Sequence, residues 1–203
     1  MVFFSAIVMD LLPLFPTPIA SFSNFITEKE RVELFENVKK INHYKHGLLK
    51  GKSFSTHSDS DGGVLPPQGN ILNDNIRKRV QNSVDEYVKE YGILSCKITN
   101  IWSNIQHSGS SLKEHSHPNS VISGALYINA NDLMWFHNPN PYVFYTASNG
   151  NNYYHCEWHS IPVQSCQLIL FPSWLKHGKS DAPCKMDDRM VISFNTNYMI
   201  NYE

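Results

Sequence analysis

Three histidines and one arginine carry the chemistry that this sequence suggests. His115 and His117 are separated by a single residue, His177 follows much later, and Arg189 comes soon after it. Residues two positions apart on a strand point to the same face, so the first two imidazoles can bind one metal ion. His177 follows an apolar segment and a turn and can supply a third nitrogen. Three imidazoles suit zinc, iron, copper or nickel, and ligand type alone does not choose among them.

Arg189 opens an alternating segment that ends near Tyr198. On a strand, Arg189 and every second residue after it would form a mostly polar face, with apolar residues on the other face. A guanidinium binds a carboxylate through two charge-assisted hydrogen bonds. We therefore expect Arg189 to line a cavity and hold an anion. The alternative is an arginine at a strand edge that pairs with Asp187 or Asp188.

The N-terminal part of the chain predicts two helices that could support such a cavity. A capping box at residues 27–30 begins a helix that should reach about Asn42. Apolar residues at helical spacing predict a second helix over 74–91, with Gly92 as its C-cap. The segment between them, residues 43–70, is rich in Gly, Ser, Asp and Pro and is interpreted as a long loop. An extended edge segment is expected within residues 10–23.

The rest of the chain is typical of short strands, because β-branched and aromatic runs alternate with clusters of Asn, Gly and Pro. We predict strands at 98–106, 121–129, 133–136, 143–146, 153–158, 167–171 and 190–198. The fold class is therefore α+β, a closed sandwich or cupin-like jelly roll with the N-terminal helices packed on one sheet. We expect a single domain over 1–203, with a helical part at 1–94 and a jelly-roll core at 95–203.

Composition agrees with one globular domain, since the chain has 203 residues, 41% of them hydrophobic and 17% charged. The net charge of −1 gives no general reason to bind nucleic acid or a membrane surface. The four cysteines lack a CxxC spacing, and the short apolar start lacks the features of a signal peptide. Reduced thiols and a cytoplasmic location are expected, Met9 is an alternative start to Met1, and a homodimer is the default assembly.

Several short motifs together resemble those of the iron(II)/2-oxoglutarate-dependent dioxygenases, in particular a group of small proteins often found in phage and bacterial genomes. The resemblance covers roughly residues 100–198 and rests on segments 102–104, 115–118, 123–129, 171–177 and 189–195. It implies a double-stranded β-helix, Fe(II) bound by His115, His117 and His177, and 2-oxoglutarate as co-substrate held by Arg189. It also implies oxidation of a substrate, by default hydroxylation, in the host cytoplasm if a phage encodes the chain.

Two features depart from the usual pattern of that family. The second metal ligand is commonly Asp or Glu, whereas this chain has His117. The family also often has a serine two residues after the arginine, whereas here that position is Val191 and Ser193 follows one step later. We expect Ser193, with Asn104 and Tyr127 from flanking strands, to help bind the co-substrate.

Two other classes of protein compete with the oxygenase. One is a three-histidine jelly-roll enzyme that uses no oxoacid, such as a different dioxygenase or a zinc hydrolase; it would not need Arg189 in the pocket. The other is a non-enzymatic jelly-roll module, such as a virion or sugar-binding protein, which would not need three histidines around one metal. The substrate is left open among a small molecule, a protein side chain and a base.

Overall fold

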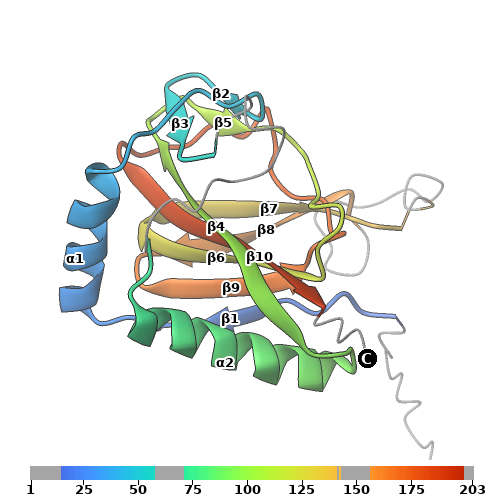
Figure 1. Ribbon diagram of the computed structural model, residues 1–203. Coiled ribbons are helices and arrows are strands. Elements are labelled where there is room, and N and C mark those ends of the chain that lie inside the picture. Colours follow the sequence, from blue (N-terminus) through green and yellow to red (C-terminus); the bar gives the residue numbers. More distant parts are fainter. Residues whose placement is uncertain (1–14, 58–70, 141, 143–155, 199–203) are drawn as a thin grey trace, which may run out of the picture.

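The computed structural model describes residues 15–57, 71–140, 142 and 156–198. Two helices lie within this part of the chain, and most of its remaining regular structure is sheet (Figure 1). The elements are β1 (Ala20–Phe22), α1 (Glu28–Lys39), β2 (Leu49–Lys50), β3 (Ser53–Ser55), α2 (Asp74–Tyr91), β4 (Cys96–Gln106), β5 (Ser111–Leu112), β6 (Ile122–Asn129), β7 (Asn131–His137), β8 (Trp158–Gln164), β9 (Gln167–Pro172) and β10 (Arg189–Tyr198).

Both helices begin and end largely where local signals place them. The backbone N–H of Glu30 donates to the Thr27 hydroxyl, and the Thr27 N–H donates to the Glu30 carboxylate, which confirms the capping box. Helix α2 ends at Tyr91 and is capped by Gly92, whose φ of 74° lies in the left-handed region that glycine tolerates. Helix α1 ends at Lys39, earlier than predicted.

Most of the predicted strands are confirmed, and the differences lie in segments with weak patterns. The strands predicted at 98–106, 121–129, 133–136, 167–171 and 190–198 correspond to β4, β6, β7, β9 and β10. The strand predicted at 143–146 lies outside the described residues, as does the first half of the one predicted at 153–158; of the other half, only Trp158 lies in a strand. Strand β8 runs from Trp158 to Gln164 and was not predicted, because it carries a proline. The proline is tolerated because β8 pairs only with β7 within the described sheets, so one of its edges is free of strand pairing.

The segment interpreted as one long loop holds two short strands that no sequence pattern predicts. Strands β2 and β3 lie within residues 43–57, and residues 58–70 lie outside the described part. Strand β3 extends the large sheet beside β4, and β2 pairs with β5. These strands have two and three residues, which is too short to show an alternating pattern.

The large sheet separates two apolar layers. It has six strands in the order β1-β9-β6-β10-β4-β3, each antiparallel to its neighbour, and β7 and β8 form a second, two-stranded sheet. Both helices pack on one face of the large sheet and bury a core that includes Leu34, Val80 and Phe194 (Figure 1). On the opposite face, a second apolar cluster joins the large sheet to β7 and β8.

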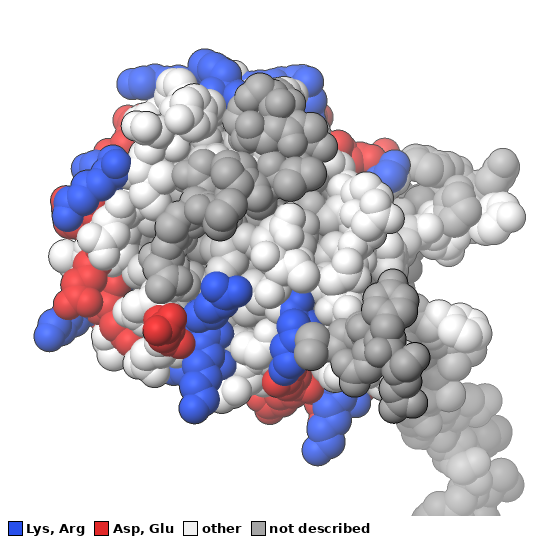
Figure 2. Space-filling view, in the orientation of Figure 1, with Lys and Arg blue, Asp and Glu red and all other residues white. Residues whose placement is uncertain are grey.

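Charged side chains are mixed in sign over the helices, as Figure 2 shows. Within α2, Arg77 and Lys78 are exposed, while Arg79 forms an ion pair with Glu30 at 2.7 Å. The basic run at 77–79 is therefore the solvated face of a helix and not a patch of one sign. Neither described helix combines the length and apolar character that crossing a bilayer requires.

Candidate metal and oxoacid site

The three predicted histidines come together at one end of the cavity between the two sheets. Their ligand atoms all lie within 4.8 Å of one another, and no other group of this kind occurs among the described residues. His115 and His177 are joined by reciprocal backbone hydrogen bonds of 3.0 and 2.9 Å. The His117 N–H donates to the Ser173 carbonyl at 2.9 Å, in the turn that follows β9. Backbone pairing between two distant segments therefore sets the spacing of the imidazoles.

Two of the imidazoles are oriented by their own backbone. His115 Nδ1 lies 2.9 Å from the Lys113 carbonyl oxygen, and His177 Nδ1 lies 3.0 Å from that of Leu175. A carbonyl oxygen can only accept, so each Nδ1 carries the proton and donates. Each Nε2 is then left with its lone pair. This is the arrangement in which metal-bound histidines are usually held.

Burial keeps the three imidazoles neutral. It is the main cause that lowers the pKa of His117 to about 3, and the neighbouring His115 and His57 add to the effect. Burial likewise lowers the pKa of His115, and it holds the pKa of His177 well below its ordinary value. A metal needs neutral imidazoles, so the donor set fits a divalent first-row metal ion without prior loss of protons.

Two other residues near the histidine pair, Glu114 and His107, could in principle bind a metal, but both lie in other contacts. The Glu114 carboxylate forms an ion pair with Lys176 at 3.0 Å. The imidazole of His107 lies 3.4 Å from Asp188 and 3.6 Å from Asp187. Neither belongs to the group of three, so His117 has no carboxylate competitor among the described residues.

Strand β10 separates the cavity from the helix core, as its alternation predicts. Met190, Ile192 and Phe194 are buried in the helix-side core. Arg189, Val191, Ser193 and Asn195 line a cavity of about 370 Å³ that the three histidines also line. This volume lies within the usual range for small-molecule sites, roughly 300–1,000 Å³.

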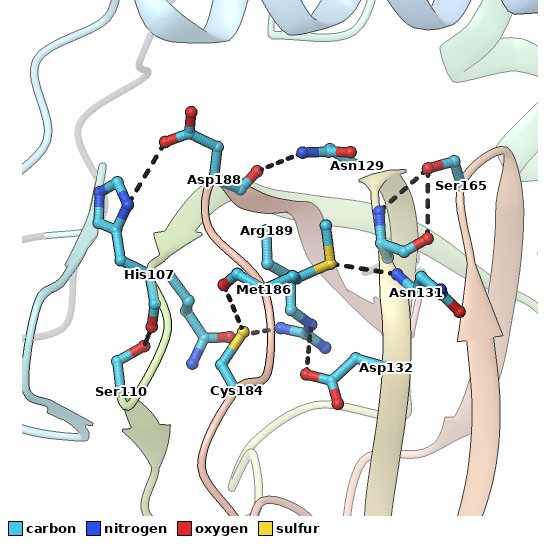
Figure 3. Close-up of polar contacts among 12 residues, drawn as sticks. His107, Ser110, Asn129, Asn131, Asp132, Ser165, Cys184, Met186, Asp188 and Arg189 are labelled. Carbon is cyan, nitrogen blue, oxygen red and sulfur yellow. Dashed lines mark hydrogen bonds and ion pairs between the residues drawn. The ribbon is translucent and has the colours of Figure 1, made fainter.

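Arg189 lies in this cavity and does not pair with its sequence neighbours. Its Nη1 donates to the side-chain oxygen of Gln106 on β4, and its Nε lies 3.7 Å from Asp132 on β7 (Figure 3). The guanidinium carbon is 5.3 Å from the centre of the Tyr127 ring. Its Nε is buried without a hydrogen bond. The alternative of a pair with Asp187 or Asp188 is therefore not what the structure has, and the guanidinium retains unused donors.

The other predicted co-substrate residues share the same cavity face. Strand pairing sets Asn104 opposite Val191 on β10, and Val191 opposite Tyr127 on β6. Ser193 lies one step further along β10, opposite Trp102 and Ala125. Burial raises the pKa of Tyr127, so its hydroxyl stays protonated and able to donate. All of these side chains line the same cavity as Arg189 and the imidazoles.

Sequence reasoning missed Gln106 and Asp132, the two polar partners of Arg189. Gln106 ends β4 and pairs across the sheet with Arg189, so a correct strand register would have found it. Asp132 sits at the start of β7, in the short gap between the strands predicted at 121–129 and 133–136. No local signal marks it, because its contact with Arg189 arises where the two sheets face each other.

Comparison with solved structures identifies the fold. HygX from Streptomyces hygroscopicus with nickel and 2-oxoglutarate bound has a TM-score of 0.61 at 9% identity, over 91% of this chain and 84% of that one. A prolyl-4-hydroxylase from Pseudomonas putida has a TM-score of 0.58 at 11% identity, over 90% and 94%. The viral collagen prolyl hydroxylase of Paramecium Bursaria Chlorella virus-1, in its 2OG complex, gives 0.55 at 12% identity, over 89% and 96%. The fold is that of these oxygenases.

A match to a protein-family model gives the class of protein. Residues 100–195 match the model of a family described as "Putative 2OG-Fe(II) oxygenase". This segment contains the three histidines and Arg189, and it coincides with the range of the predicted resemblance. The match to this family model confirms the resemblance to the iron(II)/2-oxoglutarate-dependent oxygenases, which are enzymes. No curated protein matches the chain.

Proposed function

We propose that this protein is a non-haem Fe(II)- and 2-oxoglutarate-dependent oxygenase in which His115, His117 and His177 bind the iron and Arg189 binds the co-substrate. The observation that carries the proposal is the joint placement of the three imidazoles and a largely buried guanidinium in one cavity. A metalloenzyme without an oxoacid would give no reason for Arg189 to lie in that cavity. A binding module would give no reason for three neutral imidazoles that converge.

The iron ligands are proposed from orientation and chemistry. Two Nδ1 protons are committed to backbone carbonyls, so His115 and His177 can bind only through Nε2. Three neutral ligands would leave the bound Fe(II) with more net positive charge than the usual two histidines and one carboxylate. We infer that the anionic co-substrate compensates for this charge when it binds.

The oxoacid is proposed to extend along the cavity face of β10, from the imidazoles to Arg189. Iron with 2-oxoglutarate supplies the oxidising chemistry of this class, by default hydroxylation of a C–H bond. Asn104, Tyr127 and Ser193 line the same cavity and offer neutral hydrogen-bonding groups to the co-substrate. The chain's own task is to orient both reactants and to exclude water.

We further propose that the two sheets form a double-stranded β-helix, or jelly roll, within a single domain. The support is the set of antiparallel strands on both sides of the cavity and the likeness to solved oxygenases. Of the similar solved structures, HygX has been crystallised with hygromycin B bound, and another is a viral collagen prolyl hydroxylase. We propose that this chain, too, oxidises a small molecule or a protein side chain.

Anaerobic titration tests the assignment. The purified protein is loaded with Fe(II) and then titrated with 2-oxoglutarate, and the weak visible charge-transfer band of the chelate is followed. We expect one iron per chain and a saturable band. Absence of the band in a protein that binds iron would refute the oxoacid reading and favour a metalloenzyme of another kind.

A variant of Arg189 distinguishes binding of the iron from binding of the co-substrate. Arg189→Ala should bind Fe(II) as the wild type does, and it should require about ten-fold more 2-oxoglutarate to develop the band, because a charge-assisted contact with the far carboxylate is lost. Arg77→Ala, an exposed position on α2, is the matched control and should leave the titration unchanged. If both variants need the same concentration of 2-oxoglutarate to develop the band, Arg189 does not bind the co-substrate.

A further inference from the structure

A carboxylate lies inside the pocket end proposed to receive the far carboxylate of 2-oxoglutarate. Asp132 Oδ2 is 3.7 Å from Arg189 Nε, and their side chains are 11% and 12% exposed, respectively (Figure 3). Both residues line the cavity. The cationic end of the pocket is thus opposed by a nearby negative charge before any anion enters.

Asp132 is not what fixes the guanidinium in place. Its contact with Arg189 is longer than a hydrogen bond, and Nε has no hydrogen-bond partner. The guanidinium is held by the Gln106 side chain at Nη1 and by the ring of Tyr127. The main effect of Asp132 on Arg189 is therefore electrostatic.

We propose that Asp132 is a positioning and specificity-determining residue that limits how tightly Arg189 binds the far carboxylate of the co-substrate and of its product, succinate. The inference rests on the proposed function. Two carboxylates that share one guanidinium repel each other, and little water screens them in a buried pocket. Succinate retains the carboxylate that contacts Arg189, so the same repulsion favours its release.

The test is anaerobic calorimetry on the Fe(II)-loaded protein with three probes. Asp132→Asn keeps the shape of the side chain and removes its charge. We expect 2-oxoglutarate and succinate to bind about ten-fold more tightly to this variant. Binding of 2-oxobutyrate, which chelates iron but has no second carboxylate, should not change. A purely structural role for Asp132 would alter all three probes alike and weaken them.

The controls distinguish a failure of the inference about Asp132 from a failure of the oxygenase assignment. Asp85→Asn removes the same charge from a partly exposed position on α2 and should change none of the three affinities. If wild-type protein binds both Fe(II) and 2-oxoglutarate while Asp132→Asn binds the diacids no more tightly, the inference about Asp132 is wrong and the oxygenase assignment stands. If the wild type binds no oxoacid, the assignment itself fails.

A second measurement covers the case in which Asp132→Asn does not fold. The wild-type protein should prefer 2-oxoglutarate to 2-oxobutyrate by no more than about ten-fold, because Asp132 offsets part of the attraction of Arg189. A preference of about 100-fold or more in the wild type would contradict the proposal without any variant.

Discussion

The two faces of the large sheet are formed by the same strands but carry different kinds of side chain. On the helix side, the residues of β10 are Met190, Ile192 and Phe194, each no more than 1% exposed. On the cavity side, alternate residues of the same strand are Arg189 and Ser193, both partly exposed to the cavity. One strand therefore supplies stability through one set of side chains and binding through the other.

This comparison predicts that changes on the helix face affect folding, whereas changes on the cavity face affect ligands. Burial of apolar area is the main source of stability on the helix face. The cavity face keeps polar groups that folding alone does not require.

Phe194→Ala should lower the free energy of unfolding by about 3–5 kcal/mol, because a buried aromatic ring is lost and a cavity is left in the helix-side core. Urea unfolding followed by circular dichroism measures it. The neighbouring Ser193→Ala should change stability by less than about 0.5 kcal/mol. Equal losses in the two variants would abolish the distinction between the faces.

His177→Ala should weaken Fe(II) binding by about 100-fold or more, since one of three proposed ligands is removed. Its secondary structure should persist, because the backbone pairing with His115 does not need the imidazole. Equilibrium dialysis under anaerobic conditions measures the affinity. His107→Ala, which removes an imidazole that contacts Asp187 and Asp188, is the control and should bind iron normally.

Gly124→Ala should destabilise the fold by about 1–3 kcal/mol, with little direct effect on iron. A Cβ at this position would lie 2.1 Å from Cζ of Phe194, so the ring in the helix-side core must move. Thermal unfolding gives the loss. A fully stable Gly124→Ala variant would show that this face is less tightly packed than described.

Glu114→Gln should have the smallest effect, below about 1 kcal/mol in stability, because its ion pair with Lys176 is partly exposed. Iron affinity should also stay within two-fold of the wild type, roughly the size expected for a surface change. A large fall in iron affinity would instead mean that Glu114, next to His115, enters the ligand set.

The sequence anticipated those parts of the molecule whose signals are local or periodic. Alternation along 189–198 predicted both faces of β10, and the capping box predicted the start of α1. The spacing of the histidines, read with the family resemblance, predicted the group that the structure brings together. The first two signals are local to the strand and helix that they specify, whereas His177 joins the group from a distant segment and was predicted with the help of the resemblance.

Features that depend on contacts between distant segments were not predictable in this way. Strands β2 and β3 are too short to show a period, and β8 carries a proline. The Asp132 contact with Arg189 depends on how the small sheet faces the large one. A single sequence contains no local signal for such a contact, although it contributes directly to the charge of the pocket.

The central claim is that three imidazoles bind one iron ion in this cavity. X-ray absorption spectroscopy of the anaerobic Fe(II)-loaded protein tests it most directly, because the fine structure counts imidazole ligands around the metal. We predict three imidazoles in the wild type and two in His117→Ala. A spectrum with two or fewer imidazoles in the wild type, unchanged by His117→Ala, would contradict the account.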